Sequence, residues 1–268
     1  MLLLVTNRCN MMCAHCMQDS RPDSNDFMSM EVVDDFINFT KNIEYGVLMI
    51  SGGEPTLHPQ LYDIVSKIYN ESKLKPKKIL IASNGDFIFD SSRTEMVQRI
   101  SKDFSDVVGW QISSFKYYYK LYNKIISNSD KIKKATEPCE CYIETDGLRK
   151  MIPLGRASKL KGIEKLCDNQ KYKNVSCINN HLIALQSENI QDYFMKVVIS
   201  GSYCSPAIDS YGNIRFGESI FCQKIGSLKD DPEMILYKSK NTNPCGKCYN
   251  WKYSKKLWEK YKKVLSRL

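Results

Sequence analysis

The sequence predicts an α/β fold: a partial (β/α)6 barrel, similar to part of a TIM barrel, followed by a small C-terminal domain and a terminal helix. Three observations predict it. Short apolar runs alternate with segments of helical spacing as far as residue 145, polar or glycine-containing turns follow several of those runs, and 268 residues suffice for one large domain with an appendage. Because parallel strands need crossover helices, this alternation indicates a parallel sheet covered on both faces.

Each expected strand is a short apolar run that suits a buried position in a sheet. These runs cover Leu2–Thr6, 47–51, 77–83, 107–113 and 141–145. Each expected helix has apolar residues that recur every three or four positions. The helices cover 28–44, 59–72, 91–104 and 115–132. In such folds, ligands bind at the carboxyl ends of the strands, where the loops lie.

The alternation stops near residue 170, so the barrel core is predicted over 1–170 and a connecting segment over 171–202. Short runs, turn residues and four more cysteines predict an appended domain over 203–250. Helical spacing returns over 251–268, which predicts a C-terminal amphipathic helix. We expect its apolar stripe to dock on the body of the protein rather than on a membrane surface or a partner.

The charge and composition narrow the possible partners. The formal charge is +9, but seven Lys and Arg against one Glu lie in 251–268, so the rest of the chain is only mildly basic. This distribution argues against a nucleic-acid groove. The sequence has neither a basic secretory leader nor an apolar run long enough to cross a membrane. We therefore expect a cytoplasmic protein without a membrane partner, in a reducing compartment where clustered cysteines hold metal.

Three cysteines, Cys9, Cys13 and Cys16, follow the first strand at the spacing C-x3-C-x2-C. A structural zinc site needs four ligands, and His15 is awkwardly placed to share one metal with its neighbour Cys16. An iron–sulfur cubane normally takes four thiolates, so three leave one iron open for a substrate or cofactor. A zinc knuckle or a chance cluster is the alternative interpretation.

This spacing resembles the signature of the radical S-adenosylmethionine (SAM) superfamily, C-x3-C-x-aromatic-C. The resemblance implies that Cys9, Cys13 and Cys16 hold a catalytic [4Fe–4S] cluster whose open iron is chelated by the amino and carboxylate groups of SAM. His15 stands where Tyr, Phe or Trp is commoner. Its planar ring can still stack on adenine or hydrogen-bond near it, so His15 is a predicted SAM contact.

The turn Ser-Gly-Gly-Glu-Pro follows the second strand. Glycines let a backbone approach a ligand closely, although such a turn alone is more often structural. After the cysteine motif it resembles the family's GGE motif, which implies that this turn holds the SAM amino group. The predicted contacts are Ser51, Gly52 and Gly53, whose glycine backbones take part, and the carboxylate of Glu54.

Later strand ends also resemble family positions. Ser83 and Asn84 end the third strand and Ser113 ends the fourth, which implies contacts near the SAM ribose. The residues after Ser113 are SFK rather than the acidic DG common in peptide-modifying relatives, so no ribose-binding acid is expected there. Arg156, after the fifth strand, is a predicted partner of the SAM carboxylate. Singly, each of these residues would pass for a structural turn or a surface arginine.

A second cysteine group begins with C-x12-G-x4-C, through Gly217, and continues with C-x2-C. This pattern resembles the SPASM domain of radical SAM maturases, in the shortened form called a twitch domain. The resemblance implies a second, auxiliary [4Fe–4S] cluster, and a four-cysteine zinc site is the alternative. The predicted ligands are Cys204, Cys222, Cys245 and Cys248. The other cysteines, Cys139, Cys141, Cys167 and Cys177, are expected to be buried small hydrophobes; Cys139 and Cys141 point the same way, which leaves a role near the site open.

The resemblance implies an oxidoreductase or maturase that cleaves SAM reductively to a 5′-deoxyadenosyl radical, which abstracts a hydrogen atom from the substrate. An auxiliary cluster that accepts an electron would make the net reaction oxidative. Two substrates compete: a ribosomally made peptide, and a small alcohol or aminosugar that is dehydrogenated. The expected partners are a flavodoxin- or ferredoxin-like electron donor and, since the chain starts on its first strand, a separate peptide-binding protein. A non-catalytic iron–sulfur or zinc module is the alternative from another class.

Overall fold

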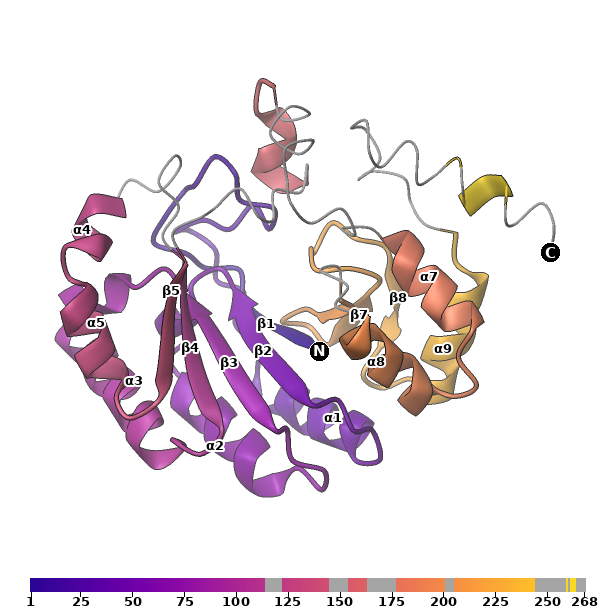
Figure 1. Ribbon diagram of the computed structural model, residues 1–268, viewed down its shortest axis with the longest axis horizontal. Coiled ribbons are helices and arrows are strands. Elements are labelled where there is room, and N and C mark those ends of the chain that lie inside the picture. Colours follow the sequence, from indigo (N-terminus) through magenta and orange to yellow (C-terminus); the bar gives the residue numbers. More distant parts are fainter. Residues whose placement is uncertain are drawn as a thin grey trace.

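The computed structural model describes residues 1–113, 122–144, 154–162, 177–200, 205–243, 259 and 261–263. Its centre is one eight-stranded sheet in the order β5-β4-β3-β2-β1-β6-β7-β8 (Figure 1). The first five strands are parallel and lie where the apolar runs predict them. They are β1 (Leu2–Thr6), β2 (Val47–Gly52), β3 (Lys78–Ser83), β4 (Val108–Ser113) and β5 (Glu140–Glu144).

Three of the four predicted crossover helices are confirmed as α1 (Met30–Thr40), α2 (Leu61–Glu71) and α3 (Ser91–Asp103). The prediction of one helix over 115–132 is wrong, because the described part of this segment contains α4 (Tyr122–Ile126) and then α5 (Ser129–Thr136). Between them, the Asn128 side chain donates to the carbonyl of Lys124 at 2.8 Å. A side chain that takes a helical carbonyl competes with the next turn, which explains the break.

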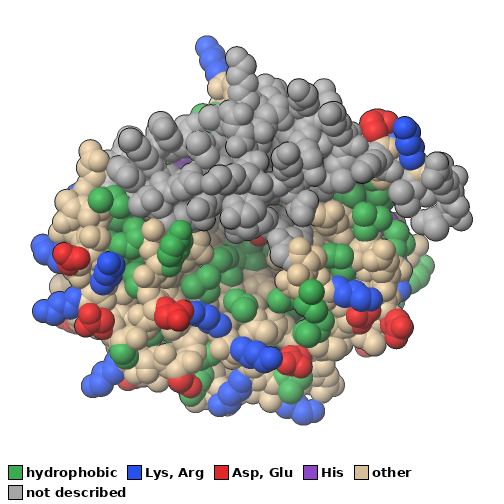
Figure 2. Space-filling model, viewed as in Figure 1, with side chains coloured by type: hydrophobic (Ala, Val, Ile, Leu, Met, Phe, Trp, Pro, Cys, Tyr) green, Lys and Arg blue, Asp and Glu red, His purple; other side chains and the backbone are tan. Residues whose placement is uncertain are grey.

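Successive side chains of β1 point to opposite faces of the sheet, which shows how the sheet is layered. Leu3 and Val5 pack into the large core under the helices, whereas Leu2 and Leu4 contribute to a small cluster on the opposite face. The helices α1, α2 and α3 cover one face of β1–β5, and no helix of the described residues is drawn over the other, concave face (Figure 1). In the space-filling view, hydrophobic side chains gather in this hollow, and charged side chains lie beside it and below it (Figure 2).

The later region continues the same sheet. β6 (Ala207–Ile208) pairs in parallel with β1, and β7 (Asn213–Arg215) and β8 (Lys224–Ser227) add antiparallel strands beyond it. The sixth parallel strand therefore joins the β1 edge and not the β5 edge. The predicted division into 1–170, 171–202, 203–250 and 251–268 stays a prediction, and this sheet runs across it.

Three further helices accompany β6–β8: α7 (Cys177–Leu185), α8 (Ile190–Ile199) and α9 (Pro232–Asn241). The segment that contains α7 and α8 carries no motif that could be recognised from the sequence. Tyr261, one of the few described residues of the C-terminal segment, is 2% exposed and packs edge-to-face on His181, 5.6 Å between ring centroids. The stripe of the C-terminal segment is therefore docked on the body at this residue. No helix in the described ranges is both long and apolar enough to cross a membrane.

Candidate functional site

A cavity of about 210 Å³ lies at the carboxyl ends of β1 to β4, beneath the cysteine loop (residues 7–21). The structure brings every residue of the predicted SAM and first-cluster site to the wall of this one cavity. These residues are Cys9, Cys13, His15, Cys16, Ser51, Gly52, Gly53, Glu54, Ser83, Asn84, Ser113 and Arg156. They come from segments spread over more than half of the chain, because parallel strands deliver their carboxyl ends to one edge of the sheet.

The cysteine loop is closed at its base by backbone hydrogen bonds. The Cys9 N–H donates to the Arg21 carbonyl at 3.1 Å, and the Arg21 N–H donates to the Asn7 carbonyl at 3.3 Å. The three thiols are unbridged. Within the described ranges, no three His, Cys, Asp or Glu side chains are grouped to hold a single metal ion. A cubane places each thiolate on a different iron, so it does not require that convergence.

The surroundings of Cys9 and His15 favour the neutral forms of these two side chains when no metal is bound. Burial raises the pKa of Cys9 to about 12, and the charge of Glu54 adds to this effect. Burial also lowers the pKa of His15 to about 4, with a contribution from Arg156. A cysteine in such a place is deprotonated when a metal centre supplies the compensating positive charge. Three partly buried thiols beside an uncharged ring thus suit an iron–sulfur cluster.

The two glycines at the carboxyl end of β2 bring two backbone segments of the protein together, and their contact with SAM stays a prediction. A Cβ atom on Gly52 would lie 2.2 Å from the Thr6 carbonyl oxygen, and one on Gly53 would lie 2.0 Å from the Arg8 carbonyl oxygen. In the observed fold the Gly53 N–H donates to Thr6 at 2.6 Å, and the Glu54 N–H donates to Arg8 at 2.8 Å. The glycines therefore let the turn after β2 meet the start of the cysteine loop, backbone against backbone.

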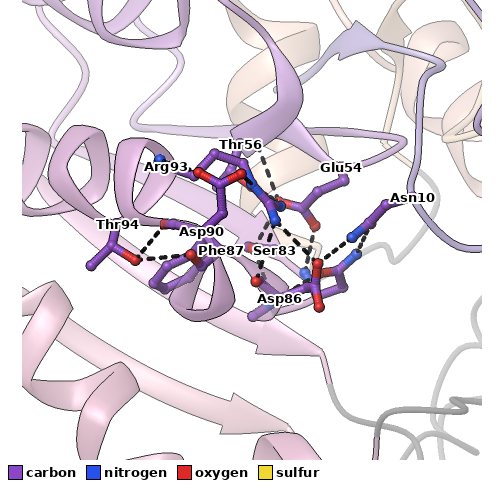
Figure 3. Close-up of polar contacts among 11 residues, drawn as sticks. Asn10, Glu54, Thr56, Ser83, Asp86, Phe87, Asp90, Arg93 and Thr94 are labelled. Atoms are coloured by element: carbon purple, nitrogen blue, oxygen red, sulfur yellow. Dashed lines mark hydrogen bonds and ion pairs between the residues drawn. The ribbon is translucent and has the colours of Figure 1, made fainter.

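Glu54 joins the carboxyl ends of β2 and β3 (Figure 3). Its side chain is 1% exposed, and Oε1 accepts from the Thr56 N–H at 3.1 Å, the Thr56 hydroxyl at 2.7 Å and the Ser83 hydroxyl at 2.8 Å. Oε2 accepts from the Asn84 N–H at 2.7 Å. Burial raises the pKa of Glu54, although these hydrogen bonds favour the ionised form. The Glu54 side chain thus holds the ends of β2 and β3 together at the cavity wall.

Asn10 anchors the cysteine loop to the turn after β3. Its side-chain oxygen accepts from the Asn84 amide at 2.9 Å, and its amide donates to the Asp86 carboxylate (Figure 3). Arg93 on α3 holds Asp86 in turn through an ion pair of 3.2 Å. Asn10, Asp86 and Arg93 were not predicted from the sequence. The position of Asp86 directly after the Ser-Asn-Gly turn was the one available signal.

Arg156 holds the opposite side of the loop. Its Nε donates to the Cys13 carbonyl at 2.9 Å, Nη1 to the Asp19 carboxylate at 2.8 Å and Nη2 to the Ser20 carbonyl at 2.7 Å. Gly155, which was not predicted to matter, has φ of +54°, and a Cβ there would meet the Cys16 carbonyl oxygen at 2.7 Å. Pairing of Arg156 with the SAM carboxylate stays a prediction, and each guanidinium nitrogen already has a partner in the protein.

A third contact joins the loop to the region of the second cysteine group. The Gln18 side chain and the Met17 carbonyl bind residues 218–220, and Glu218 lines the cavity. This segment was not predicted as part of the site, although Gly217 and Cys222 of the C-x12-G-x4-C motif flank it. Of the predicted auxiliary ligands, Cys222 is described, and Cys204, Cys245 and Cys248 lie outside the described residues.

Cys139 and Cys141 take no part in this cavity. Cys139 directly precedes β5 and Cys141 is its second residue, so both lie at the amino end of this strand. The cavity lies at the carboxyl ends of the strands. Both pack on the main core, and burial raises the pKa of both thiols. Cys139 is buried, as predicted, whereas Cys141 is only partly buried, and neither lines the cavity. Cys167 and the Cys177 side chain fall outside the described residues.

The fold and the cavity define a class: an enzyme with an open α/β barrel whose reaction site lies at the strand ends beneath a three-cysteine loop. The family model of the radical SAM superfamily matches residues 3–149, more than half of the chain, and the chain belongs to this superfamily. The family implies a [4Fe–4S] cluster and SAM, and the residues at the cavity fit both.

Curated relatives match a shorter stretch. A probable GTP 3′,8-cyclase of Methanothermobacter marburgensis is 31% identical over 88 residues, which is 33% of this chain and 28% of the relative. A probable GTP 3′,8-cyclase of Methanococcus maripaludis is 35% identical over 86 residues, which is 31% of this chain and 27% of the relative. The chain thus spans less than a third of the length of these relatives.

Solved structures match over nearly the whole chain. Native anSMEcpe with bound AdoMet has a TM-score of 0.54 at 14% identity, covering 98% of this chain and 96% of that chain. Native anSMEcpe with bound AdoMet and Cp18Cys peptide has a TM-score of 0.53 at 14% identity, covering 98% and 95%. At this identity the likeness shows a shared fold.

Proposed function

We propose that this enzyme cleaves SAM reductively and uses the resulting radical to abstract a hydrogen atom from its substrate. One observation carries the proposal: the cysteine triplet, the turn after β2 and the polar ends of β3 and β4 line a single cavity. Cys9, Cys13 and Cys16 would hold the cluster. When bound, the cluster supplies the electron that converts SAM to methionine and a 5′-deoxyadenosyl radical.

The residues of the chain position SAM and shield the reaction. The neutral His15 ring offers a planar surface to adenine, and the Ser51 and Ser113 hydroxyls can bind the polar groups of SAM. Glu54, held by four hydrogen bonds, keeps Ser83 and Asn84 in place at the end of β3. A preorganised wall of this kind aligns a cofactor with little reorganisation and excludes stray hydrogen donors.

We propose a ribosomally made peptide as the substrate. The charged residues that line the described part of the cavity are Glu54, Glu218 and Arg156, and Arg156 is paired with Asp19. This lining suits a neutral or cationic side chain better than a polyphosphate. Ala82, Gln111 and Tyr142 lie in register across β3, β4 and β5, and Tyr142 is 56% exposed. This row leads from the cavity across the open face of the sheet. The peptide in the anSMEcpe complex is a further support.

The auxiliary site is the second part of this proposal. Cys204, Cys222, Cys245 and Cys248 would hold a second [4Fe–4S] cluster, which accepts an electron from the substrate radical and makes the modification oxidative. A flavodoxin- or ferredoxin-like donor would reduce the first cluster, and a separate protein would present the peptide. Dehydrogenation of a small alcohol or aminosugar uses the same site and is the competing outcome of a substrate screen.

The test is anaerobic reconstitution with iron and sulfide, followed by metal analysis and an assay for 5′-deoxyadenosine. We expect about eight irons per chain, falling to about four in a C9A/C13A/C16A variant that no longer cleaves SAM. A C139A/C141A variant is the matched control and should keep both properties. Unchanged iron in the triple variant, or no SAM cleavage by the loaded wild-type protein, would refute the proposal. About four irons with zinc retained would make the auxiliary site structural.

A further inference from the structure

The side-chain amide of Gln18 joins the cysteine loop to the segment that precedes Cys222. Its Nε2 donates to the Glu218 carbonyl at 2.6 Å, and its Oε1 accepts from the Ile220 N–H at 2.9 Å. Between these two residues, the Ser219 hydroxyl donates to the Met17 carbonyl at 2.8 Å. Three hydrogen bonds thus connect two consecutive loop residues to three consecutive residues of the later region. We call this set of contacts the Gln18 latch.

The side chains of the Gln18 latch are buried, so their hydrogen bonds are not freely exchanged for bonds to water. Gln18 is 5% exposed and Ser219 is 1% exposed. A buried donor or acceptor that loses its partner bears the full cost of desolvation, so the latch opens as a unit or not at all. Both ends of the latch are close to predicted ligands, because Gln18 follows Cys16 by two residues and Ile220 precedes Cys222 by two.

Two contacts behind the latch hold the later segment to the sheet. The Arg215 guanidinium donates to the Cys222 carbonyl at 3.3 Å and forms an ion pair of 2.8 Å with Asp209. Asp209 directly follows β6, which pairs with β1, the strand that leads into the cysteine loop. The loop and the 218–222 segment are therefore fastened to each other both through the sheet and through Gln18.

We propose that Gln18 is a positioning residue that couples the order of the cysteine loop to the order of residues 218–222. When a cluster orders the loop, the latch holds Glu218 at the cavity wall and fixes the backbone that carries Cys222. Loading of the first site thereby prepares the second region for its own ligand. The inference rests on the proposed function in one respect, that the loop takes up a cluster.

Hydrogen–deuterium exchange tests this coupling without an assay of turnover. The protein carries C245S and C248S, so that iron and sulfide load only the first site. With Gln18 present, loading should slow amide exchange in the peptide that contains 218–222 by about tenfold, which corresponds to the gain of one or two buried hydrogen bonds. Q18M keeps the length of the side chain but removes both hydrogen bonds, and we expect the slowing to fall below about twofold.

Gln191 supplies a matched control. Its amide makes the same two-point contact with a backbone, donating to the Glu44 carbonyl at 3.1 Å and accepting from the Glu44 N–H at 2.6 Å. Q191M should leave the slowing at 218–222 intact. S219A approaches the latch from the other side and should also reduce the slowing, so the test does not depend on Q18M folding.

The outcomes separate the two proposals. If the loaded protein shows iron at the first site and cleaves SAM, but exchange at 218–222 is equally slowed in wild type, Q18M and S219A, the latch does not couple the regions and the inference is wrong. The inference is equally wrong if loading slows no exchange at 218–222 in the protein that retains Gln18. If the first site takes up no iron, the proposed function itself fails.

Discussion

Arg156 and Asp19 form an ion pair of 2.8 Å that clasps the cysteine loop. The same guanidinium donates to the carbonyls of Cys13 and Ser20, so one side chain holds three points of the loop. Asn10 and its contacts with Asn84 and Asp86 hold the opposite side. The loop that would carry the cluster is therefore held at several points by contacts within the protein.

The clasp predicts that R156Q and D19N both release iron faster from the reconstituted first site. Loss of a charge-assisted hydrogen bond in a partly buried place costs about 1–3 kcal/mol, which corresponds to roughly 5- to 150-fold in an equilibrium for loop opening. The measurement is the rate at which a chelator removes iron from the C245S/C248S protein.

SAM affinity distinguishes the role of Arg156 in holding the cysteine loop from its predicted role as a partner of the SAM carboxylate. A clasp requires D19N and R156Q to behave alike, with similar SAM affinity in protein that has kept its cluster. If Arg156 binds the SAM carboxylate instead, R156Q alone weakens SAM binding and D19N leaves it unchanged.

Glu54 is predicted to be a large contributor to stability. E54Q places an amide where two oxygens accept four hydrogen bonds, so at least one buried donor loses its acceptor, at a cost of about 2–4 kcal/mol. Urea denaturation of the metal-free protein measures this change. E140Q is the matched control, because Glu140 is an exposed partner of Lys78 on β5, and we expect little change there. Equal stability of E54Q and wild type would contradict the network in Figure 3.

The close approach at Gly53 predicts a strongly destabilising G53A substitution. The added Cβ would lie 2.0 Å from a backbone oxygen that cannot move aside cheaply, so the turn after β2 must separate from the cysteine loop. We expect a loss of melting temperature together with a loss of iron binding. G46A is the control, because Gly46 has φ of +63° and nothing within 4 Å of its Cβ position. Its cost should be confined to backbone strain of about 1 kcal/mol.

The buried histidines predict that the protein loses stability as the pH falls below 6.5. Burial lowers the pKa values of His58 and His181. Below pH 6.5, these two side chains therefore bind protons more readily in the unfolded chain than in the folded protein. Their contribution is therefore fully present above pH 6.5 and declines as the pH drops towards the lowered folded values. His58 holds its neutral form with Nδ1 accepting from the Gln60 N–H at 3.1 Å and Nε2 donating to the Met28 carbonyl at 3.0 Å.

Urea midpoints between pH 7 and pH 5 measure this slope. H58Q and H181Q should each be less stable than wild type at pH 7 and less dependent on pH across that interval. A comparison with wild type isolates the histidines, because carboxyl groups common to all three proteins contribute equally. A variant that keeps the full wild-type slope would show that its histidine is not responsible.

Local sequence patterns determined the strand–helix alternation, the place of the cysteine loop after β1, the polar turns after β2 and β3 and the polar end of β4. These features depend on residues close together in the chain, where period and spacing carry the signal. Parallel pairing then brings the strand ends to one edge, so the candidate site of twelve residues was accessible from the sequence.

Contacts between distant segments were decided only by the tertiary structure. The two-residue strand β6 is too short to show a period, so its pairing with β1 could not be read from the sequence. Gln18 meets Glu218, 200 residues away, through one side-chain amide, and Arg156 meets Cys13 and Ser20 through their carbonyls. Backbone carbonyls are the same at every residue, so nothing in the sequence marks the ones that such side chains will bind. The sequence thus determined twelve of the residues that line the cavity, and the packing of the folded chain decided the others and what holds the cysteine loop above it.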